Sequence, residues 1–115
     1  MHNQVKVGFL AVAFIIGGCA SAPVPTGSMQ NSLSTIKSAE ELGAENVPQA
    51  KLHLALAKEQ NAKAKELAAK EEEERAGFVL MRSEADGELA LALTHENNAR
   101  LEAQQAAAKL NAPKN

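Results

Sequence analysis

The scarcity of aromatic side chains limits what this chain can fold into more than any other feature. The 115 residues include no Trp and no Tyr, and two of the three Phe residues, Phe9 and Phe14, lie within the first 18 positions. Phe78 is the single aromatic residue after them. Because each aromatic side chain buries a large apolar area, the sequence argues against a thick globular core. Its length allows one small domain at most.

The residues that replace aromatics are helix formers. Alanine alone accounts for 23 positions, and Leu, Glu, Lys and Gln are also abundant; all of them favour helix. The composition therefore predicts an all-α fold. The net charge is -2, and no run of Lys or Arg forms the basic patch of a nucleic-acid-binding protein, so nucleic acid is not an expected partner.

The beginning of the chain has the pattern of an export signal. Lys6 precedes an uninterrupted apolar run at residues 7–16, which is followed by Gly17 and Gly18. A membrane-spanning helix needs about 20 apolar residues, so this run is too short to span. It has the length of the apolar part of a secretory signal peptide. We therefore predict that residues 1–18 are a signal peptide that is removed.

The residues around the expected cleavage point resemble the lipobox of bacterial lipoproteins. Ile16-Gly17-Gly18-Cys19 gives a branched apolar residue, two small residues and a cysteine. The resemblance implies that Ile16, Gly17 and Gly18 are recognised by the lipoprotein signal peptidase. It implies that the thiol of Cys19 carries a diacylglyceryl thioether, and that the new amino group receives a further acyl chain such as palmitate.

Two other interpretations of this region stay open. An ordinary signal peptidase could cut after Ala20-Ser21-Ala22, although a proline directly after the cut, here Pro23, is unfavourable and the cysteine would then be unexplained. A buried N-terminal core helix is disfavoured by the two glycines and the following prolines. Since Cys19 is the single cysteine, no disulfide within the chain is possible.

Lipidation would attach the protein to a membrane. Two or three acyl chains hold far more firmly than one, because each buried methylene contributes about 0.8 kcal/mol. By the sorting rule known for lipoproteins of enteric bacteria, Ala20 after the lipidated cysteine implies the outer membrane, with the protein facing the periplasm. The inner membrane and the cell surface remain open.

After the lipidated cysteine we expect a tether and then an alanine-rich helical domain. Residues 19–28 contain two prolines and a glycine, which predict an extended tether. The domain is expected at residues 29–112, with helices at 29–43, 48–72 and 73–110 and a tail at 113–115. Ser28 is the expected first N-cap, Gly43 a helix stop, and Pro48 a first-turn residue.

Each expected helix has a stripe of residues spaced by three and four, which marks a face that packs. In the first helix the stripe is Met29, Leu33, Ile36 and Leu42, and in the second it is Ala50, Leu54, Ala57, Asn61, Ala64 and Ala68. In the third it is Phe78, Met81, Ala85, Leu89, Ala92, Ala99, Ala103, Ala106 and Leu110. This predicts a short helix and long helices in a hairpin or coiled coil. Since Glu is a good helix former, one continuous helix from residue 48 to residue 110 is the alternative.

The order of these segments resembles a family of small bacterial lipoproteins with an alanine-rich domain of unknown function. The residues that carry the resemblance are Leu33, Ile36, Ala39, Gly43, Ala44 and Pro48, and later Ser83-Glu84-Ala85-Asp86 with Leu89 and Ala90. Some relatives carry this domain before an OmpA-like peptidoglycan-binding domain, and that activity is not transferred here. Braun's murein lipoprotein is also similar. It ends in a lysine that is joined to peptidoglycan, whereas in this sequence Lys114 is penultimate and Asn115 is last.

No pattern in the sequence indicates catalysis. His53 and His95 have no ligand partner one turn away, and residues 95–99 begin like HExxH but lack the second histidine. Both histidines are expected to be solvated. The acidic run at residues 71–74 points in several directions on a helix, so no metal site and no cofactor are expected.

We therefore expect a lipid-anchored, non-catalytic envelope protein with a structural or adaptor role. Its expected partners are the membrane, through the covalent lipid, and an envelope protein or a second copy. The alternative is a self-associating coiled-coil spacer between the outer membrane and the cell wall, similar to Braun's lipoprotein. A small lysis or toxin-like peptide is disfavoured by the charge of the helices.

Overall fold

The computed structural model describes residues 26–113, and this part of the chain is helical with no strand. It contains α1 (Thr26–Leu42), a short 3-10 helix η1 (Ala44–Asn46), α2 (Pro48–Ala69) and α3 (Glu73–Asn111). The predicted all-α fold is confirmed. The predicted signal peptide, the predicted lipobox, most of the predicted tether and the last two residues lie outside the described residues.

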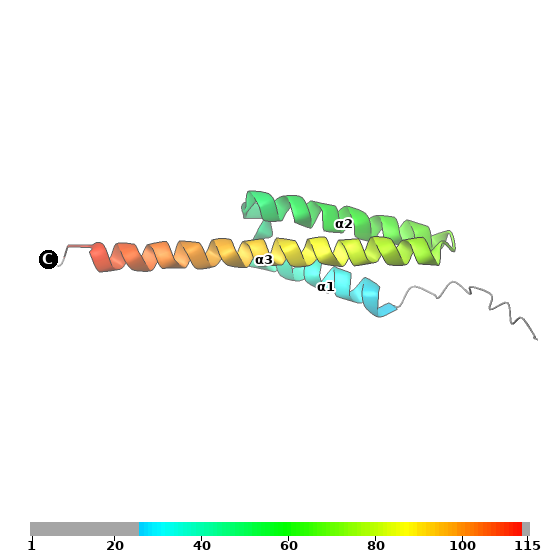
Figure 1. The fold of residues 1–115 in the computed structure, drawn as a ribbon, viewed down its shortest axis with the longest axis horizontal. Coiled ribbons are helices and arrows are strands. Elements are labelled where there is room, and N and C mark those ends of the chain that lie inside the picture. The colour runs from blue at the N-terminus through cyan, green and yellow to red at the C-terminus, as the bar shows by residue number, and fades with distance from the viewer. Residues whose placement is uncertain (1–25, 114–115) are drawn as a thin grey trace, which may run out of the picture.

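The helices form a hairpin with a third helix along one side (Figure 1). α2 runs antiparallel to α3, and this pair forms the largest contact of the fold. α1 packs mainly on α3 and runs parallel to it. The chain therefore enters the domain near the α2–α3 turn, and α3 continues past the other two helices at the opposite end.

The core is thin because it is built from small side chains. The buried apolar cluster consists of Ile36, Ala39, Ala44, Ala50, Leu54, Ala57 and Ala90, with Val47, Leu91 and Leu93 packed against it. Alanine lets helix backbones approach closely, but it removes little apolar surface from water compared with Leu or Phe. The stability of the long α2–α3 contact is therefore the sum of many small contributions.

The helix is interrupted by a turn at Lys70–Glu72, between α2 and α3, so the alternative of one continuous helix is wrong. The N–H of Glu71 donates to the Ala68 carbonyl at 3.0 Å, and the N–H of Glu72 donates to the Leu67 carbonyl at 3.0 Å. This is the bonding pattern of a Schellman helix end. Glu71 adopts the left-handed conformation, with φ 61°, at a position where glycine is usual. A run of good helix formers thus contains a turn, because the turn lets the two apolar faces meet.

The other helix ends lie near their predicted positions. α1 begins at Thr26, inside the segment expected to be an extended tether, and ends at Leu42. Gly43 follows with φ 97°, a conformation that glycine adopts without strain. Pro48 begins α2 as expected.

The predicted stripe of α2 is close to the buried face, whereas that of α1 is less so. Ala50, Leu54, Ala57, Asn61 and Ala64 are buried, and Leu67 takes the place expected for Ala68. In α1, Ile36 is buried but Leu33 is exposed, and the other buried positions are Ser32 and Ala39.

The predicted stripe of α3 is not the face that packs within the chain. The buried residues of this helix are Ala76, Leu80, Ser83, Gly87, Ala90 and Thr94; we call this face the inner seam. Phe78, Met81 and Leu89 are 61%, 65% and 42% exposed. The sequence stripe follows the largest apolar residues, but α3 contacts two helices at once, and such close approach selects small side chains. A Cβ added at Gly87 would lie only 3.1 Å from Thr35 Cγ2.

Candidate interaction surface

A buried polar layer crosses the three helices in the middle of the bundle. Asn61 Nδ2 on α2 donates to Ser32 Oγ on α1 at 3.0 Å, and Ser83 Oγ on α3 donates to the Ala57 carbonyl at 2.7 Å. The Ser32 and Ser83 hydroxyl oxygens are 2.6 Å apart. Since the Ser83 proton points to Ala57, Ser32 donates to Ser83. Each hydroxyl proton is thus used once, as burial requires.

A second polar cluster bridges α2 and α3 at the surface. His53 Nδ1 lies 2.8 Å from one carboxylate oxygen of Asp86, and Gln60 Nε2 donates to the other at 2.8 Å. The expectation that His53 is solvated is therefore wrong, because it is half-buried and bound to Asp86. Gln60 Oε1 is buried and has no hydrogen-bond partner among the described residues. This cluster fixes the relative position of the two helices.

Lys58 joins the end of α1, η1 and α2. Its ammonium lies 2.5 Å from a Glu40 carboxylate oxygen and 3.3 Å from one of Glu45. The hydrogen bond that Lys58 donates to Glu40 is the largest cause that raises the pKa of Lys58; desolvation acts in the opposite direction, and Glu45 adds to the increase. All three side chains are substantially exposed, so the cluster contributes to orientation more than to stability.

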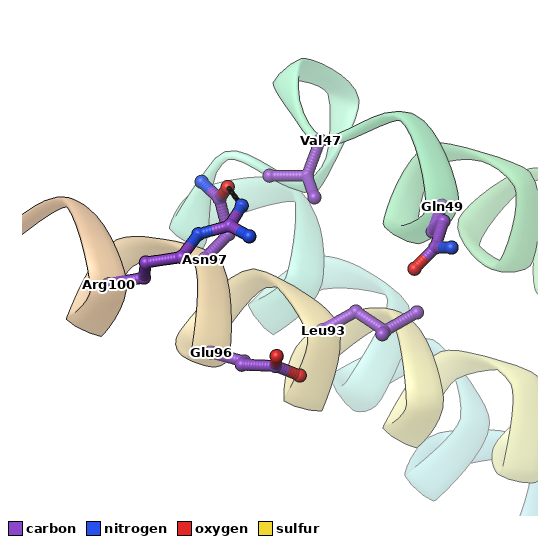
Figure 2. A pocket seen from close by; sticks show the side chains of 6 residues that line it. All are labelled: Val47, Gln49, Leu93, Glu96, Asn97 and Arg100. Carbon is purple, nitrogen blue, oxygen red and sulfur yellow. Dashed lines mark hydrogen bonds between the residues drawn. The ribbon is translucent and has the colours of Figure 1, made fainter.

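A shallow pocket lies where α2 begins and α3 continues beyond it (Figure 2). Val47 and Gln49 line it from the α2 side, and α3 supplies Leu93, Glu96, Asn97 and Arg100. Arg100 donates to the Asn97 side-chain oxygen at 3.1 Å, the contact drawn in Figure 2. The pocket is open to solvent and brings together no nucleophile with a base.

Most of the large apolar side chains that are exposed lie on α3. The predicted stripe of this helix is exposed at every position, from Phe78 to Leu110; we call it the outer stripe. In addition, all residues from 99 to 111 are exposed. We call residues 99–111 the α3 extension. Leu101 and Leu110 within the extension are 46% and 86% exposed. An apolar surface left open over this length is typical of an interaction site.

The residues singled out from the sequence are otherwise spread over the fold. Ile16, Gly17, Gly18 and Cys19 lie outside the described residues. His95 is exposed. Within residues 26–113, no three His, Cys, Asp or Glu side chains come together to hold a metal ion.

The residues behind the family resemblance divide between the core and the surface. Ile36, Ala39, Ala44, Ser83 and Ala90 are buried, whereas Leu33, Pro48, Ala85 and Leu89 are exposed. The buried polar layer was missed from the sequence. The polar Asn61 within the α2 stripe was the signal that could have indicated it.

Comparison of the chain with protein-family models, curated proteins and solved structures found no match. None of the helices in residues 26–113 combines the length and the apolar character that crossing a membrane demands.

Proposed function

We propose that this chain is a lipid-anchored, non-catalytic protein of the bacterial envelope, attached through Cys19 and facing the periplasm, whose α3 helix presents the surface for interaction. Its role is structural or that of an adaptor. The anchor is proposed from the apolar run at residues 7–16 and the Ile16-Gly17-Gly18-Cys19 motif that ends it.

One observation about the fold carries the proposal: the entry of the chain into the domain and the α3 extension lie at opposite ends. Thr26 begins α1 near the α2–α3 turn, and α3 runs parallel to α1 and continues past it. A helix of 39 residues is about 58 Å long. A chain held at its beginning would thus present the α3 extension far from the point of attachment.

The surface of the described residues supports an interaction role over a catalytic one. The polar clusters at Ser32 and at His53 form hydrogen bonds between helices. Most of the exposed large apolar side chains, in contrast, lie on α3. Attachment at one end and an open helix at the other suit a protein that connects a membrane to another component of the envelope. Sorting to the outer membrane follows from Ala20 by the rule given above.

Intact-mass analysis of the full chain extracted from membranes tests the anchor. The expected mass lacks residues 1–18 and includes a diacylglyceryl group and an acyl chain. Cys19→Ser should leave the uncleaved, unacylated chain, whereas the control Ser21→Ala should be processed normally. Cleavage before Pro23 without added lipid would instead establish an ordinary exported protein and reject the proposal.

The final membrane is tested separately by Ala20→Asp. This change should move the lipidated protein from the outer to the inner membrane in density-gradient fractionation of enteric bacteria. An unchanged distribution would reject the proposed sorting while leaving the anchor intact.

A further inference from the structure

α3 has two apolar faces, and only one of them is used within the chain. The inner seam is covered by α1 and α2, whereas the outer stripe faces solvent. Since consecutive residues on a helix are separated by about 100°, Ser83 on the inner seam and Ala85 on the outer stripe point in nearly opposite directions. The largest exposed side chains of the outer stripe are Phe78, Met81, Leu89 and Leu110.

The spacing of the outer stripe fits a second helix. From Ala85 onward the positions on this face are 85, 89, 92, 96, 99, 103, 106 and 110, which follow a heptad repeat with Glu96 as the one charged member. Such a repeat is the seam of a two-stranded coiled coil. The three-helix packing on the inner seam does not obstruct it, because α1 and α2 lie on the other side of α3.

The charged and polar side chains along one edge of the stripe identify the second helix as another α3 in the opposite direction. This edge carries Glu88, His95, Glu102 and Lys109, seven residues apart, all exposed. In an antiparallel pair related by a two-fold axis, an edge faces the same edge of its partner. With the axis between Asn97 and Asn98, Glu88 faces Lys109 of the second copy and His95 faces Glu102 of it, each twice.

The same register matches side-chain sizes. Leu89 meets Ala106 of the second copy, Leu110 meets Ala85, and Ala92 meets Ala103. A parallel pair in register would instead set Glu96 against Glu96 and would form neither the Glu88–Lys109 pair nor the His95–Glu102 contact. The side chains of Glu88, His95, Glu102 and Lys109 make no hydrogen bond and no ion pair with another residue of the range 26–113 in the single chain, so all four are available.

We propose that two copies of this chain associate through antiparallel pairing of the outer stripe of α3 over residues 85–110. This names the partner of the surface described above, and it does not depend on the lipid anchor. The paired length is about 38 Å. With a contact about one helix wide, the interface belongs to the small, weak class, so association should depend on concentration.

Disulfide trapping tests the orientation. The full chain with Cys19→Ser, purified in mild detergent, contains no other thiol. In this background, Ala92→Cys mixed with Ala103→Cys should form a crosslinked dimer on oxidation, and neither variant alone should, because residues 92 and 103 of one helix are about 16 Å apart. The control Gln104→Cys, which is turned away from the stripe, should not crosslink to Ala92→Cys.

Two outcomes of this experiment would overturn the proposal. Crosslinking of Ala103→Cys to itself would establish a parallel pair or a different antiparallel register. Absence of any crosslink would establish that the stripe does not pair with a second copy. Because Cys19 is replaced throughout, neither outcome bears on the lipid anchor.

A charge exchange tests the register. Glu88→Lys should raise the dimer Kd in sedimentation equilibrium about tenfold, and Lys109→Glu should do the same, since each creates two like-charged pairs. The double variant should restore the wild-type Kd to within about threefold. The control Glu59→Lys on α2 makes the same charge change away from the stripe and should have no effect. A double variant as weak as the single ones would reject this register.

Discussion

The hydroxyl oxygens of Ser32 and Ser83 lie 2.6 Å apart at the centre of the bundle and connect α1 to α3. Both residues are fully buried, and the contact continues through Asn61 and the Ala57 carbonyl into α2. In a core with few large side chains, this layer fixes how the three helices align, because shifting any helix along its axis would leave buried polar groups unpaired.

Removal of the Ser83 hydroxyl should destabilise the bundle. Ser83→Ala leaves the buried Ser32 hydroxyl without its acceptor, which should lower the free energy of unfolding by about 1–3 kcal/mol. Urea denaturation followed by circular dichroism measures it. The exposed Ser34→Ala on α1 is the control and should change stability by less than about 0.5 kcal/mol. Equal effects of the two substitutions would contradict a role for the layer.

The two glycines of α3 should respond differently to alanine. Gly77→Ala places a methyl group in open space and should gain about 1 kcal/mol from helix propensity. At Gly87 the new methyl would press on Thr35, whose hydroxyl is held by the Asn31 carbonyl at 2.9 Å. Gly87→Ala should therefore be less stable than Gly77→Ala by about 1–2 kcal/mol in urea denaturation.

A double variant is the control for this comparison. Thr35→Ala removes the Cγ2 methyl group that an alanine at position 87 would press on. In the double variant Gly87→Ala with Thr35→Ala, most of the stability difference from Gly77→Ala should therefore disappear. If Gly87→Ala alone were as stabilising as Gly77→Ala, the close approach of α1 to α3 would be disproved.

Glycine at position 71 should stabilise the α2–α3 turn. Glu71 has φ 61°, a conformation that costs most residues about 1 kcal/mol, whereas glycine adopts it freely. Glu71→Gly should raise the thermal midpoint in circular dichroism. Glu71→Ala removes the same charge but keeps the Cβ, so it should bring no such increase; a gain as large as that of glycine would point to charge repulsion within residues 71–74 instead.

The Lys58 cluster should make stability depend on pH in the alkaline range. The pKa of Lys58 is raised above its ordinary 10.5, chiefly by its hydrogen bond to Glu40. A raised pKa in the folded state means that the contribution is fully present below the unfolded pKa and is lost as the pH rises through the folded value.

This dependence is measured as a difference between urea midpoints. The midpoint of the wild type minus that of Lys58→Gln should be constant below pH 10 and should decrease above pH 10.5. Lys65→Gln, an exposed lysine of the same helix, should show a flat difference. A difference that grows with pH would give the wrong sign and reject the assignment.

Periodicity predicted the helices well but did not decide which face of α3 is buried. In α2 the apolar and small residues lie on one face, so a single stripe describes it. α3 has two such faces, and hydrophobicity alone favours the one with Phe78 and Met81. Burial of Ser83 and Gly87 instead depends on how closely α1 and α2 approach, which local sequence does not encode. The Asp86 partner of His53 is 33 positions away, beyond the reach of any local pattern.

Local sequence does not determine the turn at Glu71 for a similar reason. Four consecutive glutamates at residues 71–74 have good helix propensity, and the helix is still interrupted there. The antiparallel contact of α2 with α3 outweighs that local preference.

The parallel course of α1 and α3 determines how the domain would respond to tension. A force applied at Thr26 and at the far end of α3 pulls α1 and α3 in opposite directions along their common axis. Their contacts, from Ser32–Ser83 to the bond between Asn98 and the Leu42 carbonyl, would then be sheared together instead of being opened one after another like a zipper. Such loading spreads the force over the whole length of α1, so even a thin alanine-rich bundle can transmit a pull without its ends separating first.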